Sequence, residues 1–143
     1  MSEERKKVLV LEDIQSDRGF YEEFPEFFDC PETVDHFAER GKGTSRALVE
    51  EKLRTIPYIA VLVDDYMDCI NERRLMENLC DGKYGSLNQE IPTYSIAHMY
   101  STKHIEGLRN YAGTFLPPSW CGFDREEESR RIVRETMKVL GGQ

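Results

Sequence analysis

The sequence has little that would direct the chain into a membrane or onto nucleic acid. No apolar run is long enough to span a bilayer, and residues 1–7 are charged and lack the apolar core of a signal peptide. The net charge of −8 argues against a phosphate-backbone binder, because such proteins need a positive surface. We therefore expect a cytoplasmic protein that binds neither membranes nor nucleic acid.

The four cysteines are also too scattered to form a recognisable site. Cys30, Cys69, Cys80 and Cys121 are irregularly spaced, and no two of them make a C-x-x-C pair. A structural zinc site or a redox dithiol is therefore not expected, and the thiols are predicted to be reduced.

Two short apolar runs that end in acids are the most informative feature of the chain. Val8–Leu11 is followed by Glu12 and Asp13, and residues 58–63 are followed by Asp64 and Asp65. Such runs are typical of strands buried on both faces of a parallel sheet. The length of 143 residues suits a single domain spanning 1–143.

The remaining apolar patterns predict an alternation of strands and helices. Proline and glycine mark several boundaries, among them Pro57, Gly113 and Gly141. The expected strands are 7–12, 33–37, 58–63, 93–97 and 114–116. The expected helices begin after Ser16 or Asp17, at Thr44 or Ser45, at Asn71, at Thr102 and at Asp124. This order indicates a doubly wound α/β fold, (βα)5, with a parallel sheet covered on both faces.

Two helices carry specific expectations about their buried faces. The first is expected to direct its aromatic residues to the core, with a partner or homodimer surface as the alternative; these residues are Phe20, Tyr21, Phe24, Phe27 and Phe28. The second helix should bury an apolar stripe made of Ala47, Leu48, Val49, Leu53 and Ile56.

The acids that follow the two apolar runs predict a metal site. In a sheet of order 2-1-3-4-5, ligands bind beyond the carboxyl ends of strands one and three, where the strand order reverses. Glu12, Asp13, Asp64 and Asp65 would gather there, and an all-oxygen cluster favours Mg²⁺. The alternative is a set of solvated acids at the strand ends. Asp65 could equally be a metal ligand, a residue that contacts the ligands without binding the metal, or an exposed loop acid.

These same segments resemble those of response-regulator receiver domains. Leu9–Asp13 is similar to the acid pair of that family, and Val63–Met67 to its phosphoacceptor segment, with Met67 matching its D-x-x-M pattern. The resemblance implies a flavodoxin/receiver-like fold, Asp64 as the phosphorylated residue, Mg²⁺ as cofactor, and a kinase or downstream effector as protein partner.

The chain departs from that family at two positions. Ala97 aligns where receivers carry Ser or Thr after strand four, and Pro118 aligns where they carry Lys after strand five. The resemblance therefore implies an atypical domain, either phosphorylated on Asp64 or acting as a pseudo-receiver interaction module. Residues 101–103 could replace the missing groups if their loop folds inward.

A second resemblance gives an alternative function. His98–Ser101 and Pro117–Trp120 are partly similar to segments of the cyclic-phosphate-processing receiver-like group, for which a metal-dependent phosphoesterase role has been proposed. By this resemblance Asp13, Asp64 and Asp65 would bind the metal and His98 would act as acid and base. A histidine at a strand end is also commonly a hydrogen-bonded scaffold residue, and His36 and His104 are assigned no role.

Overall fold

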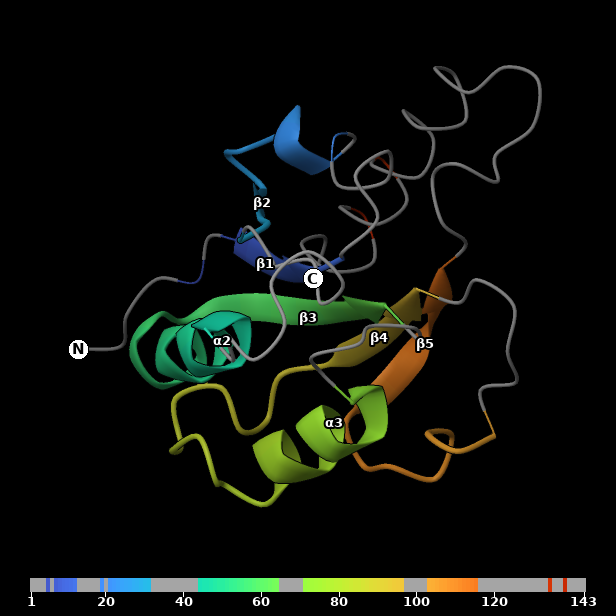
Figure 1. Ribbon diagram of the computed structural model, residues 1–143. Helices are drawn as coiled ribbons and strands as arrows, with labels where there is room; N and C mark the ends of the chain where they lie inside the picture. The colour runs from blue at the N-terminus through green and yellow to red at the C-terminus, as the bar shows by residue number, and fades with distance from the viewer. Residues whose placement is uncertain are drawn as a thin grey trace.

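The computed structural model describes residues 5, 7–12, 19, 21–31, 44–64, 71–96, 103–115, 134 and 138. Five parallel strands form one sheet in the order β2-β1-β3-β4-β5, as expected (Figure 1). The strands are β1 (Lys7–Leu11), β2 (Phe28–Asp29), β3 (Tyr58–Asp64), β4 (Thr93–Ile96) and β5 (Tyr111–Phe115). The helices with defined bounds are α2 (Thr44–Thr55) and α3 (Glu72–Cys80).

The register of the central strands follows from their apolar composition. Val10 pairs with Leu62 and Leu11 with Val63, so β1 and β3 end at the same edge of the sheet. Successive side chains of a strand point to opposite faces, and both faces of these strands are buried. The central strands therefore hold the two halves of the core together.

The core consists of one cluster on each face of the sheet. Helices α2 and α3 cover one face (Figure 1). There, side chains such as Val49 of α2 and Met76 of α3 form a cluster with residues of β1 and β3. The other face carries Tyr21, Phe28, Leu62 and further residues. Burial by α2 is narrower than expected: Val49 and Leu53 are buried, whereas Ala47 is exposed and Leu48 and Ile56 remain 42% and 36% exposed. The predicted stripe is too wide, because only the helix face that carries Val49 and Leu53, four residues apart, lies against the sheet.

Helix α3 confirms the sequence prediction closely. Leu75, Met76 and Leu79 are buried. The Asn71 side chain caps the helix by accepting a hydrogen bond of 2.9 Å from the amide of Arg74. Gly82, with a φ of +78°, follows the helix in the left-handed region that favours glycine.

The placement of Phe28 on helix one is wrong. The second strand is Phe28–Asp29, which pairs with Val8 and Leu9, so Phe28 lies in the sheet and not on helix one. Pro25 explains this, because it ends the helical turn and returns the chain to the sheet early. Residues 33–37, the predicted strand, lie outside the described residues.

The expected helix at 102–111 is also replaced, within residues 103–110, by consecutive turns. The amide of Leu108 donates to the carbonyl of Ile105 and that of Tyr111 to the carbonyl of Leu108, which are i to i+3 bonds. Gly107 lies in this segment and weakens a helix there. Strand β5 accordingly starts at Tyr111, three residues before the predicted strand, and ends at Phe115.

Helical residues are also found at the two ends of the chain. Gly19, Tyr21 and Glu22 are helical, as expected of helix one, and Arg134 and Lys138 are helical and exposed within the predicted last helix. Phe20 and Asp124 lie outside the described residues. No helix in the described part of the chain has the length and apolarity needed to cross a bilayer.

Asn88 connects three segments at the amino end of the sheet. Its Nδ2 donates to the carbonyls of Leu53 and Ile56 at 2.8 and 2.7 Å. Its Oδ1 accepts from the amide of Tyr58 and from Nη1 of Arg5, both at 2.9 Å. The loop 81–92 is thereby fixed to the end of α2 and to the start of β3.

Tyr58 is buried at the start of β3 and bonded to an acid. Its hydroxyl donates to Oδ2 of Asp29 at 2.6 Å, and Nζ of Lys52 lies 3.1 Å from the same oxygen. Burial, and then the hydrogen bond and charge of Asp29, raise the pKa of Tyr58 far above its ordinary value. The folded protein therefore keeps this phenol neutral at pH values where an unfolded tyrosine ionises.

We expect this difference to reduce stability in alkali. Above about pH 10, the ordinary value for tyrosine, the unfolded chain binds fewer protons than the folded one, so the free energy of unfolding falls as pH rises. Tyr58→Phe should remove part of this fall. Urea denaturation at pH 8 and pH 10.5 measures it for both proteins, and equal losses of stability between the two pH values would contradict the prediction.

Candidate functional site: the acidic edge of the sheet

The structure brings Glu12 and Asp64 together at the carboxyl ends of β1 and β3. Asp64 is the last residue of β3, and Glu12 directly follows β1. Because Leu11 pairs with Val63, the register places Glu12 beside Asp64. Neighbouring strands lie about 4.8 Å apart, so the two backbones are direct neighbours.

The two carboxylates also belong to the same face of the sheet. Val10 and Leu62, two residues earlier on each strand, lie in one core cluster, and alternation gives Glu12 and Asp64 the same side. Asp64 pairs on its other edge with Ile96, which lies in that cluster as well. We call Glu12 and Asp64, with their neighbours Asp13 and Asp65, the acidic edge.

Both described acids of the acidic edge are inaccessible to solvent. Glu12 and Asp64 are each 0% exposed. Two neighbouring carboxylates in a buried setting repel each other when both are charged, and a cation bound between them relieves that repulsion. Carboxylate oxygens are the donors that Mg²⁺ prefers, so the chemistry of this pair fits a hard divalent cation.

The other predicted site residues lie outside the described residues. These are Asp13, Asp65 and His98, and with them Ala97 and Pro118, the two departures from the receiver pattern. Within the described ranges, no three His, Cys, Asp or Glu side chains come together in a way that could hold a metal ion. The structure thus places Glu12 and Asp64 side by side, and metal binding by all four acids and the role of His98 stay predictions.

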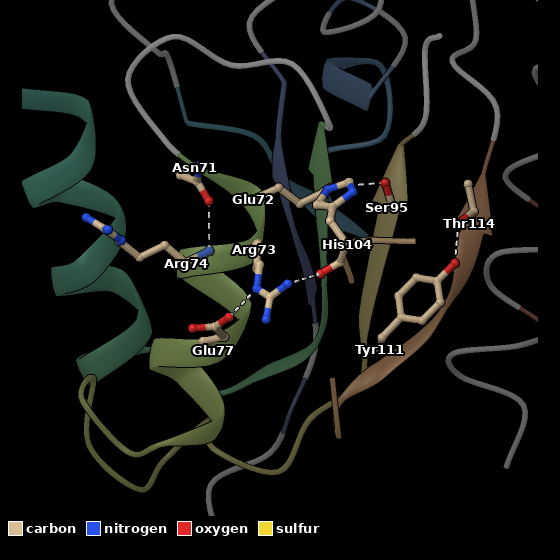
Figure 2. A network of polar contacts seen from close by, with 9 residues as sticks. All are labelled: Asn71, Glu72, Arg73, Arg74, Glu77, Ser95, His104, Tyr111 and Thr114. Carbon is tan, nitrogen blue, oxygen red and sulfur yellow. Dashed lines mark hydrogen bonds and ion pairs between the residues drawn. The ribbon is translucent and has the colours of Figure 1, made fainter. Parts of the chain in front are cut away.

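A second polar cluster lies on the opposite face of the sheet from Glu12 and Asp64, around Glu72 at the start of α3 (Figure 2). The Oε2 of Glu72 accepts a hydrogen bond of 2.6 Å from Oγ of Ser95 on β4. Its Oε1 lies 2.9 Å from Nε2 of His104, which therefore donates to it. Arg73 donates to the carbonyl of His104 at 3.0 Å and pairs with Glu77.

This cluster contains the residue types of a hydrolytic triad in the wrong order. In such a triad the histidine bridges the acid and the nucleophile. Here Glu72 lies in the middle, and Ser95 and His104 bind its two different oxygens. Ser95 therefore donates its proton to a carboxylate and is not activated by the imidazole.

The sequence analysis missed this cluster. Glu72 was read only as part of an expected helix, and His104 was assigned no role. The available signal was Glu72 itself, since an acid in the first turn of a helix is stabilised by the helix dipole. Its partners are 23 and 32 residues away in sequence, so only the fold could identify them.

Comparisons with known proteins identify the fold. No protein-family model and no curated protein sequence matches the chain. Among solved structures, the receiver domain of sensor histidine kinase PA1611 from Pseudomonas aeruginosa PAO1, with a magnesium ion coordinated in its active-site cleft, matches with a TM-score of 0.57. The identity is 11%, and the match covers 98% of this chain and 100% of that one. With its five-stranded parallel sheet in the order 2-1-3-4-5, the chain therefore has the receiver-like fold.

Proposed function

We propose that this protein is an atypical receiver-fold signalling domain that binds Mg²⁺ at its acidic edge. The observation that carries the proposal is the position of Glu12 and Asp64, which are fully buried and adjacent at the carboxyl ends of β1 and β3. This is the place where open parallel sheets bind ligands. The receiver domain of PA1611, which shares the fold, has its magnesium ion in an active-site cleft.

In this proposal Glu12, Asp13, Asp64 and Asp65 would hold the ion. When bound, Mg²⁺ supplies positive charge that neutralises the carboxylates and the oxygens of an incoming phosphate. The repulsion between Glu12 and Asp64 would favour retention of the ion, because removing it leaves two adjacent buried charges.

Asp64 is the residue that we propose accepts a phosphoryl group. One of its carboxylate oxygens would attack the phosphorus of a small donor in line, forming an O–P bond as the bond to the leaving group breaks. A kinase or a downstream effector would be the protein partner. If Asp64 does not accept phosphate, the same domain would act as an interaction module.

Asp64→Asn separates these steps. We expect it to weaken Mg²⁺ binding by about tenfold or more, because a charged oxygen ligand is lost. The same change should raise the melting temperature of the metal-free protein, because it removes the repulsion with Glu12. Titration calorimetry and thermal melts with and without Mg²⁺ measure the two effects.

Asp81→Asn is the matched control, since Asp81 is an exposed aspartate at the opposite end of α3. It should change neither the Mg²⁺ affinity nor the melting temperature of the metal-free protein. No Mg²⁺ binding by the wild-type protein at millimolar concentrations would refute the proposal. Equal binding by wild type and Asp64→Asn would refute the assigned site.

Intact mass spectrometry tests phosphorylation. Wild-type protein incubated with Mg²⁺ and a small phosphodonor should gain one phosphoryl group, and Asp64→Asn should gain none. Mg²⁺ binding without an adduct would leave the interaction module. Turnover of a cyclic phosphodiester without an adduct, lost in His98→Ala, would favour the phosphoesterase alternative.

A further inference from the structure

Ser95 and Glu72 make a buried hydrogen bond close to the strand that ends at Asp64. Oγ of Ser95 donates to Oε2 of Glu72 at 2.6 Å, and Ser95 is 0% exposed. Ser95 pairs in register with Val63, and the next residue of β4, Ile96, pairs with Asp64. The first turn of α3 is therefore attached to β4 at the level of Val63, one residue before Asp64 (Figure 2).

This bond also determines where the chain that leaves β3 must end. Residues 65–71 connect Asp64 to Glu72, so the sheet holds one end of the connection and the bond to Ser95 holds the other. A segment held at both ends has fewer conformations to lose when a ligand orders it. Asp65, one of the proposed metal ligands, is the first residue of this connection.

The second oxygen of Glu72 does the same for the chain that leaves β4. Its Oε1 lies 2.9 Å from Nε2 of His104. Residues 97–103 connect Ile96 to His104, so Ser95 and His104 lie just outside the two ends of this connection and meet at one carboxyl group. The side chain of Glu72 is 3% exposed, and water cannot readily take the place of these partners.

Glu72 cannot itself bind an ion held between Glu12 and Asp64, because it lies on the opposite face of the sheet. Residues that do not touch a metal can still set its affinity by holding the ligands in place. Loss of such a contact typically lowers the affinity by about 10- to 100-fold.

We propose that Glu72 is a positioning residue for the acidic edge. By binding Ser95 and His104 with its two oxygens, it keeps the connections that follow β3 and β4 in the arrangement that an ion between Glu12 and Asp64 requires. The inference rests on the proposed function, because it needs Mg²⁺ at the acidic edge.

Ser95→Ala and Thr93→Val give a matched comparison within β4. Both variants remove a hydroxyl from a side chain that is 0% exposed, and neither changes a titratable group. Oγ of Ser95 binds Glu72, whereas Oγ1 of Thr93 has no hydrogen-bond partner among the described residues. By titration calorimetry with MgCl₂, we expect Ser95→Ala to bind Mg²⁺ about tenfold more weakly than wild type and Thr93→Val to bind it equally well.

Thermal melts of the same samples separate positioning from structural support. At temperatures well below the melting temperature the dissociation constant refers to folded protein, so a variant that is only less stable keeps the wild-type affinity. Glu72→Ala removes both contacts and should weaken binding at least as much as Ser95→Ala. Adding Ser95→Ala to Glu72→Ala should weaken binding no further, because the serine acts through the glutamate.

Amide hydrogen exchange of the metal-free protein tests the route of this effect. The amide of Leu75 bonds within the first turn of α3, and that of Leu108 bonds within residues 103–110. The amide of Val61, which bonds in the sheet, is the internal reference. We expect Glu72→Ala to lower the protection of Leu75 and Leu108 relative to Val61 by about fivefold, as the loss of one hydrogen bond predicts.

Ser95→Ala covers the case in which Glu72→Ala fails to fold, because it removes only a hydroxyl; it should then lower the protection of Leu75 alone. Equal Mg²⁺ affinity in wild type and Ser95→Ala, with weaker binding by Asp64→Asn, would overturn the inference and leave the proposed function intact. An equal loss of affinity in Thr93→Val, or unchanged exchange at Leu75, would also overturn it. No Mg²⁺ binding by the wild-type protein would refute the proposed function and this inference together.

Discussion

Replacing Asn88 with alanine is expected to lower the free energy of unfolding by about 3 to 5 kcal/mol. Asn88 is 0% exposed, and it uses both donors and both acceptor positions of its amide. Alanine would leave the amide of Tyr58 and the carbonyls of Leu53 and Ile56 without that partner. Each buried polar group stripped of its hydrogen bond costs about 1 to 3 kcal/mol.

Urea denaturation at neutral pH measures this loss. Asn78→Ala is the matched control, because the Asn78 amide makes a single bond of 3.2 Å to the hydroxyl of Tyr84 and is partly exposed. We expect the control to cost less than about 1 kcal/mol. If the two variants lose similar stability, the four hydrogen bonds of Asn88 do not contribute the expected free energy of unfolding.

Replacing Ile105 with alanine is expected to cost about 2 to 4 kcal/mol. Ile105 is 0% exposed, although it lies in a connection made of turns, and it belongs to the core cluster beneath α2 and α3. Its removal opens a cavity between residues 103–110 and the sheet, where the partly buried Leu108 and Tyr111 pack against the cluster. The amides of residues 103–110 should then exchange faster than they do in the wild-type protein.

Ile56→Ala makes the same change at a side chain that is 36% exposed. It should cost less than about 1 kcal/mol by urea denaturation. A loss in Ile56→Ala equal to that in Ile105→Ala would contradict the prediction that the buried Ile105 contributes more than the exposed Ile56.

The central strands were predictable from the sequence because their burial is nearly complete. A run such as Val8–Leu11 can avoid water only inside a sheet that is covered on both faces, and the acids that follow it mark where the strand ends. The cap of α3 at Asn71 followed from a comparably local signal, whereas the strand order was implied by the resemblance to receiver domains. The sequence also predicted that Glu12 and Asp64 lie close together, and the register of β1 and β3 places them side by side.

The errors arose where local signals compete. The residues after Phe24 carry helix-compatible aromatic spacing, but Pro25 and the free edge of β1 favour a short strand at Phe28. In residues 103–110, the spacing of Ile105 and Leu108 also fits a helix. Gly107 and the attachments to α3 favour turns there instead.

The sequence by itself determined the α/β class, the strands that form the centre of the sheet and the two acids that end them, because each of these depends on neighbours in the chain. The tertiary structure alone decided which polar groups meet across long separations: Asn88 with the start of β3, and Glu72 with Ser95 and His104. The physical reason is that burial forces a polar group to find a partner, whereas the identity of that partner depends on how helices and strands pack.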